Sequence, residues 1–320
     1  MPLLVPSFSS KGFPTKKSGA SVIAEIFEGA AESITASYLV SGYDIHHELL
    51  PSAAALPAPD VIFLDSGGYE LRIEHDLSAD RHVPHSPLEW NRDTYDRLLE
   101  SWPEHVSAAM VSYDEPELRV HLDAQLESAR ESLLPRKHLR VFLLKPETTT
   151  SEFLTGVLST VRADPSPLSD FNIIGLTEEE LGSSLLDRME NIALLRLDCD
   201  AAGVDVPIHI FGALDALTTL LYFVSGADVF DGLSWLRYGF TNGTAISRRN
   251  YAALVGTPDT SDQNAYARMV KENIFYLERM RLAMSKFAID FDFSRLGPSS
   301  TIVREAFDAL RTRAKLRRRL

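Results

Sequence analysis

The sequence predicts an α/β protein folded as a (β/α)8 TIM barrel with additional C-terminal helices. Three observations favour this fold. Short apolar runs recur eight times, and most are continuous rather than alternating, as in strands covered on both faces. Helical patterns separate several of the runs, as the alternation of a (β/α)8 barrel requires. The length of 320 residues is compatible with one large domain of this kind.

The eight apolar runs predict the strands of the barrel in chain order. They occupy residues 3–10, 37–44, 61–68, 108–116, 140–147, 171–178, 207–215 and 227–235. Between them, residues 21–34 and 183–203 have apolar side chains at helical spacing. These two segments predict helices on the outside of the barrel.

The chain after the eighth strand predicts a helical extension. Residues 237–250 have no regular pattern and are expected to be irregular. Residues 264–284 and 300–320 have apolar side chains three and four apart, which predicts two helices packed outside the barrel. We therefore expect the barrel at residues 1–250 and the extension at residues 251–320.

The composition is that of an ordinary globular protein, with 45% apolar and 24% charged residues. No run approaches the roughly 20 apolar residues of a membrane span, and the first residues lack the basic start and cleavage site of a signal peptide. We expect a cytoplasmic protein with no membrane partner. Cys199 is the only cysteine, which excludes an internal disulfide and a multi-cysteine zinc site within one chain.

The charge is distributed unevenly along the chain. The formal net charge is −13, yet residues 311–320 contain six basic residues and no acid, so the first 310 residues carry −19. A polyanion would be repelled by the body and attracted by this basic tail. The alternative is a solubilising helix end whose cations suit the helix dipole.

Charged side chains stand at the predicted carboxyl ends of four strands: Asp65, Asp114, Lys145 and Asp231. In such barrels these ends form the active site. Three acids at one mouth should raise some of their pKa values through burial and mutual repulsion. Any one of them alone could instead be a helix N-cap or a loop acid.

Two carboxylates facing a sugar can perform glycosyl transfer. One attacks the anomeric carbon and the other serves as general acid and base. The segment Ser66, Gly67 and Gly68 offers backbone N–H groups and room for a planar ring. Asp114 could accept hydrogen bonds from the amidine-like edge of such a base.

These residues carry a resemblance to a known family. "LDSGGYE", "VSYDEP", "IIGLTEEELG" and "GADVFDGLSWLRYGFTNGTA" resemble, in the same order, signature segments of the tRNA-guanine transglycosylases, the queuine and archaeosine base-exchange enzymes. The resemblance covers about residues 1–285. It implies a glycosyltransferase that exchanges guanine for a 7-deazaguanine base in nucleic acid, through a covalent glycosyl-aspartate intermediate.

The resemblance also implies roles for individual residues. Asp231 would be the nucleophile and Asp65 the general acid and base. Tyr69 resembles the aromatic that stacks on the base, and Asp114 the carboxylate that reads its amidine edge. Gly175 and Leu176 resemble the backbone segment that faces the substituent on the deazapurine ring, and Arg237 matches the arginine beyond the nucleophile.

This sequence departs from the family's pattern in the base site. Lys145 stands where the family has a glutamine followed by glycine, Glu70 where it usually has glutamine, and Ser41 where it has asparagine. A cation in place of a neutral amide changes recognition. The base or its substituent is therefore expected to differ from queuine and from the precursors of queuosine and archaeosine.

A second departure concerns zinc. The family has three closely spaced cysteines and a histidine that bind zinc near the C-terminal side. Those cysteines are absent here, and Lys271 and Glu272 occupy the region of the histidine. We expect no metal and no cofactor. Because the zinc element helps to dock tRNA in the family, the acceptor could be tRNA, DNA, a protein or a small nucleoside.

A polynucleotide path is predicted beyond the eighth strand. The segment combines aromatic and cationic side chains able to stack bases and pair phosphates, namely Arg237, Tyr238, Phe240, Arg248 and Arg249. An ordinary loop is the alternative. Other readings stay open: an enzyme of an antiviral defence or DNA-modification cluster, a non-catalytic base-binding subunit, and a homodimer or a complex with a partner protein.

Overall fold

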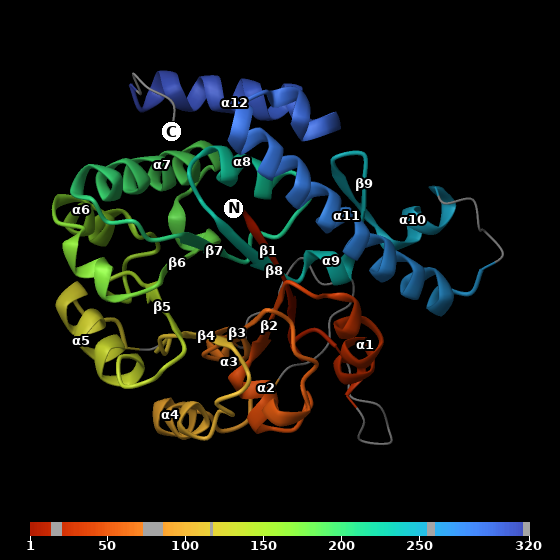
Figure 1. Ribbon diagram of the computed structural model, residues 1–320, viewed down its shortest axis with the longest axis horizontal. Helices are drawn as coiled ribbons and strands as arrows, with labels where there is room; N and C mark the ends of the chain where they lie inside the picture. Colours follow the sequence, from red (N-terminus) through yellow and green to blue (C-terminus); the bar gives the residue numbers. More distant parts are fainter. Residues whose placement is uncertain (14–20, 73–85, 116–117, 255–259, 316–320) are drawn as a thin grey trace.

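Eight parallel strands close into a barrel in the computed structural model, which describes residues 1–13, 21–72, 86–115, 118–254 and 260–315 (Figure 1). The strands pair in chain order and the first closes onto the eighth. They are β1 Leu3–Phe8, β2 Ser37–Ser41, β3 Val61–Asp65, β4 Ala108–Val111, β5 Leu139–Leu144, β6 Ile173–Thr177, β7 Ile208–Phe211 and β8 Val229–Gly232. Seven lie within their predicted runs and β5 begins one residue before its run, so the predicted (β/α)8 barrel is confirmed.

Helices surround the barrel (Figure 1). Those between the strands are α1 Val22–Ala30, α2 Gly42–His46, α3 Gly68–Leu71, α4 Arg92–Glu100, α5 Leu122–Leu133, α6 Thr155–Ala163, α7 Leu185–Ala202 and α8 Thr218–Val224. The longest of these, α7, begins with a capping box at Ser184 and ends at Gly203 in the left-handed conformation. Among the described helices, none combines the length and apolar character needed to span a membrane.

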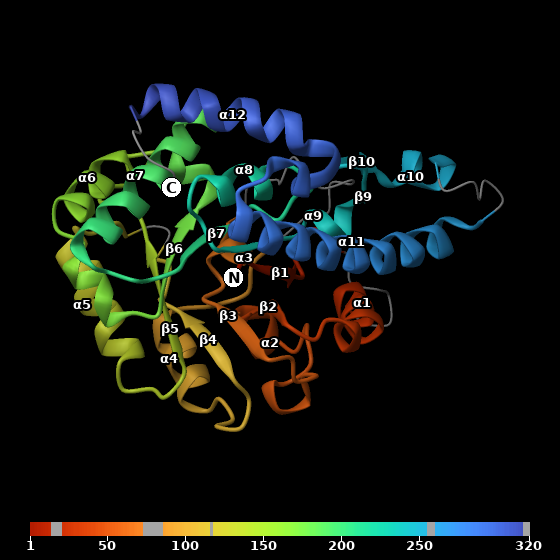
Figure 2. The ribbon, with the colours of Figure 1, turned by 45° about the horizontal axis from the view of Figure 1, so that its top comes forward.

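The C-terminal helices pack outside the barrel, as expected. After β8 come α9 Ser234–Arg237, α10 Arg248–Leu254, α11 Asp262–Asp290 and α12 Ser300–Arg313. Helix α11 lies against α9 and the segment that follows it, and α12 lies over α7 and α8 (Figure 2). Arg313 at the end of α12 pairs with Asp187 (2.5 Å) and Glu190 (2.7 Å) of α7.

The segment after α9 is not irregular, and this expectation is wrong. Strands β9 Tyr238–Thr241 and β10 Thr244–Ser247 form an antiparallel hairpin. Its two-residue turn is Asn242–Gly243, with φ of 48° and 77°. Both angles are positive, as a type I′ turn requires, and Asn-Gly is the usual sequence for it. The Asn-Gly dipeptide was therefore a hairpin signal. It was overlooked because the flanking strands show no clear alternation of apolar and polar residues.

The barrel has two apolar layers because alternate residues of each strand face opposite sides. The larger layer fills the space between the strands and the helices. The smaller one fills the barrel interior and includes Val5, Phe63, Leu143, Phe211 and Val229. Along β1, β3, β5 and β8, the inward side chain two residues further on is polar or charged. These side chains form the floor of the site.

Candidate functional site

A cavity of about 590 Å³ opens at the carboxyl ends of the strands. Its floor follows from the period of two in the strands. Ser7 comes two residues after Val5, Asp65 two after Phe63, and Asp231 two after Val229. Each second residue lines the cavity, while each first residue belongs to the inner apolar layer. The three predicted acids, Asp65, Asp114 and Asp231, all line this one cavity.

Three polar groups form hydrogen bonds with the carboxylate of Asp231. Ser7 Oγ donates to Oδ2 (2.9 Å), while the Gly212 N–H (3.2 Å) and His209 Nε2 (3.0 Å) contact Oδ1. The Gly232 N–H donates to Ser7 Oγ (3.0 Å), which fixes that hydroxyl. Contacts to both oxygens hold the carboxylate in one orientation.

Asp65 has the opposite environment. Only the Gly67 N–H donates to it in the described part of the chain (3.0 Å). Burial, the charge of Glu70 and, to a smaller degree, the charges of Asp231 and Asp114 raise the pKa of Asp65 to about 7. The predicted rise in pKa is confirmed for this acid. Asp65 can therefore carry a proton near neutral pH.

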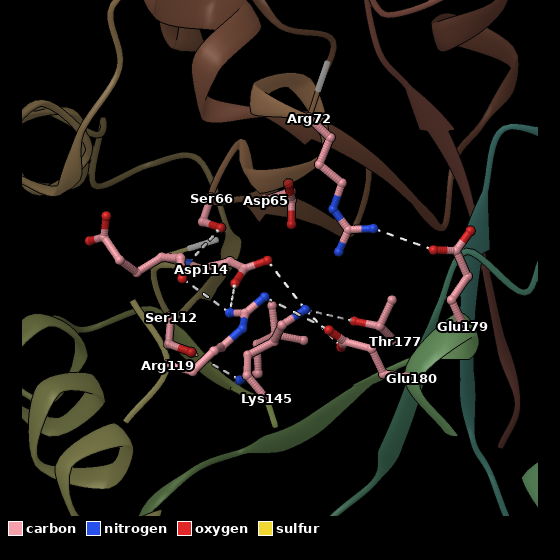
Figure 3. Close-up of polar contacts among 12 residues, drawn as sticks. Asp65, Ser66, Arg72, Ser112, Asp114, Arg119, Lys145, Thr177, Glu179 and Glu180 are labelled. Atoms are coloured by element: carbon pink, nitrogen blue, oxygen red, sulfur yellow. Dashed lines mark hydrogen bonds and ion pairs between the residues drawn. The ribbon is translucent and has the colours of Figure 1, made fainter. Parts of the chain in front are cut away.

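Asp114 belongs to a network of two acids and two cations (Figure 3). Its Oδ1 pairs with Arg119 (2.7 Å) and its Oδ2 with Lys145 (3.3 Å), and Glu180 pairs with Lys145 (2.7 Å) and Arg119 (3.8 Å). All four side chains are at most 11% exposed. Burial alone would raise the pKa of Asp114, but the charges of Lys145 and Arg119 outweigh it and lower the pKa. Repulsion among the acids therefore does not govern Asp114, and the expected rise in pKa does not extend to this acid.

Lys145 is held at the cavity floor by this network. Its Nζ contacts Thr177 Oγ1 (3.3 Å) in addition to the two carboxylates. Because Glu180 and Asp114 offset the charges of Lys145 and Arg119, the network adds little net charge to the cavity. The donor of Lys145 and the acceptor of Asp114 lie side by side.

The glycine pair after β3 has a structural reason. A Cβ at Gly67, where φ is 89°, would lie 2.8 Å from Trp90 Nε1, and a Cβ at Gly68 would lie 2.9 Å from Asp114 Oδ2. Glycine therefore allows the positive φ at Gly67 and the close approach of Asp114 to Gly68. Ser66 secures the same turn, because its Oγ accepts from the Asp114 N–H (3.1 Å).

Tyr69 lines the cavity between two cations. Lys11 Nζ lies 4.5 Å from the centre of its ring, and Arg237 Nη2 donates to its hydroxyl (3.1 Å). A cation over one face favours an aromatic ring in that position. Tyr69 of α3 and Arg237 of α9, 168 residues apart in the sequence, are thus brought into contact.

Glu70 is a further acid on the wall of the cavity. It is buried and accepts hydrogen bonds from Ser9 and from Ser41 Oγ (2.8 Å). Behind it, burial and the charge of Glu70 raise the pKa of Asp44. Ser41 of β2 and Glu70 of α3 are two positions at which the sequence departs from the transglycosylase pattern, and their side chains contact each other directly.

Several residues expected in the site do not line the cavity. Gly67, Gly175, Leu176, Tyr238, Arg248 and Arg249 are outside its lining, while Ser66, Gly68 and Lys145 belong to it. A Cβ at Gly175 would lie 2.5 Å from the Phe211 ring, so this glycine makes room for a ring that does line the cavity. Arg248 lies over the Tyr266 ring (5.2 Å), at the start of α10.

Other expectations concern the tail and metals. Residues 311–315 of the basic tail are described, and residues 316–320 lie outside the described residues. Within the described ranges, no group of three or more His, Cys, Asp or Glu side chains is arranged to hold a metal ion. Glu272 instead contacts the Tyr251 hydroxyl and Arg268 (2.7 Å).

Sequence reasoning missed several residues of the site. The sequence assigned no role in the site to Ser7, Arg119, Glu180 or His209. Ser7 and His209 could have been found by counting two residues along each strand from the inner apolar layer. The contacts of Arg119 with Asp114 and of Glu180 with Lys145 depend on tertiary packing and have no local sequence signal.

Comparison with known proteins adds no family assignment: no protein-family model and no curated protein matches this chain.

Proposed function

We propose that this protein is a transglycosylase that exchanges guanine for a 7-deazaguanine base in nucleic acid. One observation carries the proposal. Asp65 and Asp231 line one cavity, yet Asp231 is held by three donors while the pKa of Asp65 is raised to about 7. An ionised nucleophile and a protonated acid are the pair that double displacement at a sugar needs.

The proposed reaction has two matched halves. Asp231 attacks C1′, so a C1′–O bond forms and the bond from C1′ to the base nitrogen breaks. The departing guanine keeps the electron pair of that bond and takes the proton of Asp65. The incoming base then returns a proton to Asp65 and displaces the carboxylate of Asp231 from C1′.

Asp114 and Lys145 suggest how a base would be recognised. Their acceptor and donor are 3.3 Å apart on the cavity floor. A base edge with an N–H beside a carbonyl group complements this arrangement, and guanine and 7-deazaguanine both have one at N1 and C6. Tyr69, with a cation over one face of its ring, would stack on the same base.

A second candidate keeps the chemistry but uses an acceptor other than a polynucleotide. Of the five residues predicted to form a polynucleotide path, only Arg237 lines the cavity. Arg313 of the tail is occupied by Asp187 and Glu190. The net charge of −13 also opposes nonspecific binding to phosphates.

Incorporation of radiolabelled guanine tests the proposal. The wild-type protein is incubated separately with tRNA, duplex DNA, single-stranded DNA and a nucleoside mixture. Label in a polynucleotide supports the first candidate, and label in the nucleoside pool alone supports the second. Asp231→Asn is the control and should incorporate no label, because an amide cannot form the glycosyl ester. Absence of label from every pool, with the wild type folded, would contradict both candidates.

A further inference from the structure

His209 is a histidine in the barrel interior that the proposed chemistry does not yet use. It lies on β7 between Ile208 and Ile210 and has no exposed surface. Its ring stacks on Phe211, with centroids 3.9 Å apart, and meets the edge of Phe63 at 5.3 Å. The two aromatic rings leave the imidazole little freedom to rotate.

The hydrogen bonds of the ring indicate its tautomer. Nε2 lies 3.0 Å from Asp231 Oδ1, while Nδ1 is buried and has no hydrogen-bond partner among the described residues. A proton on Nδ1 would be a buried donor without an acceptor. A proton on Nε2 points at a carboxylate oxygen, which is the better arrangement. The ring therefore fits best as the neutral Nε2–H form.

We propose that His209 is a positioning residue that donates its Nε2–H to Asp231 and fixes the orientation of that carboxylate. The kinetic consequence of this inference rests on the proposed function, whereas the hydrogen bond between His209 and Asp231 does not depend on it. Since Oδ1 already receives the Gly212 N–H (3.2 Å), the imidazole gives this oxygen a second donor. Oδ2 has only the Ser7 hydroxyl (2.9 Å).

The unequal numbers of donors distinguish the two oxygens chemically. Because Oδ2 accepts fewer hydrogen bonds, it is the more nucleophilic oxygen and is the atom that attacks C1′. Oδ1 then becomes the carbonyl oxygen of the glycosyl ester. When the incoming base forms its bond to C1′, the C1′–Oδ2 bond breaks and its electron pair returns to the carboxylate. The donors on Oδ1 stabilise that returning charge. His209 gains and loses no proton in either half.

Nitrogen NMR of histidine-labelled protein tests the hydrogen bond without any substrate. Proton–nitrogen correlation spectra distinguish the two neutral tautomers, and His209→Gln assigns the signal. We expect the Nε2–H form in the wild type and a shifted Nε2–H signal in Asp231→Asn. An Nδ1–H tautomer, or a signal that ignores the Asp231 change, would overturn the proposal.

Kinetics of the exchange reaction test the positioning role. His209→Phe keeps a flat ring for stacking but removes the donor, and we expect kcat to fall about 10- to 100-fold with little change in KM for the base. His209→Gln retains an N–H donor and should recover part of the loss. His121→Phe, at an exposed site, is the matched control. A His209→Phe variant with wild-type kcat, or a loss seen only in KM, would refute the role.

The two readouts also separate this inference from the proposed function. If the wild type exchanges no base, the proposed function fails, and the tautomer measurement still decides whether His209 donates to Asp231. If exchange is observed and both variants behave as the wild type does, only the inference fails. Thermal unfolding of both variants checks that a lost rate does not reflect a lost fold.

Discussion

At the scale of residues, Asp65 and Asp231 are chemically identical side chains in different surroundings. Asp65 is the last residue of β3, Asp231 is the last but one of β8, and both line the same cavity. Hydrogen bonds to both oxygens hold the carboxylate of Asp231, whereas burial and nearby acids raise the pKa of Asp65 to about 7. The proposed division of roles between nucleophile and acid thus rests on neighbours that come from other strands.

The raised pKa of Asp65 predicts a pH-dependent cost to stability. An unfolded aspartate has a pKa of about 3.9, so the folded protein retains a proton that the unfolded chain has lost between about pH 4 and pH 7. The free energy of unfolding therefore falls across this range. Asp65→Asn removes the effect, and after allowance for solvent screening we expect a Tm about 2 to 4 °C above the wild type at pH 8.

Thermal unfolding of both proteins at several pH values checks this prediction. Below about pH 3 the two Tm values should converge, because Asp65 is then mostly protonated in both the folded and the unfolded wild type. A Tm difference that stays constant from acid to neutral pH would contradict the raised pKa.

Lys145 is predicted to select for a base carbonyl. Lys145→Met removes the donor beside Asp114 and also removes the cation nearest to Glu180. Lys145→Gln is the matched variant, because its side chain is of similar length and keeps an N–H donor. Fluorescence and calorimetry compare guanine with 2-aminopurine, which lacks the carbonyl oxygen. We expect wild type to prefer guanine by about 10-fold or more, and Lys145→Met to lose most of this preference. Equal binding of both bases by the wild type would remove Lys145 from recognition.

At the scale of elements, the strands and their ends were predictable and the contacts between loops were not. Continuous apolar runs placed all eight strands, and Asp65, Asp114 and Asp231 followed as residues of one mouth. The network of Arg119 and Glu180 around Lys145 was not foreseen, because it joins two loops with no shared pattern. Such pairings arise only when the barrel closes.

The turn after β3 gives a prediction at this scale. Gly67→Ala adds a Cβ within 2.9 Å of Trp90 and Tyr43 at a φ of 89°, so we expect a loss of about 1 to 3 kcal/mol in the free energy of unfolding. Gly156→Ala in α6 is the control, since no atom lies within 4 Å of its Cβ. Urea unfolding measures both. If Gly67→Ala is as stable as Gly156→Ala, the turn is not under the constraint described here.

At the scale of the whole molecule, the barrel gathers distant residues at one face and the C-terminal helices cover its side (Figure 2). Arg313 of the basic tail is paired with Asp187 and Glu190 of α7, so this cation is already occupied within the body of the protein. The sequence indicated the imbalance of charge between body and tail. It could not indicate which tail residue packs against the body, because that depends on how α12 lies over α7.

Truncation separates the two uses of the tail. Removing residues 316–320 deletes three arginines, and if they contact phosphates the salt slope of polynucleotide binding should fall by about 2 to 3 units. Arg313→Ala should instead lower Tm and leave the slope nearly unchanged. Binding measured over a range of salt concentrations checks both variants. An unchanged slope after truncation would favour the acceptor that is not a polynucleotide.

The central claim is that Asp231 forms a covalent bond to a sugar, and mass mapping of the trapped intermediate tests it most directly. Wild type is mixed with guanine-containing nucleic acid, quenched in denaturant, treated with nuclease and digested to peptides. The account predicts a nucleotide adduct on the peptide that contains Asp231, absent from Asp231→Asn. Base exchange without any adduct, or an adduct on Asp65, would contradict it.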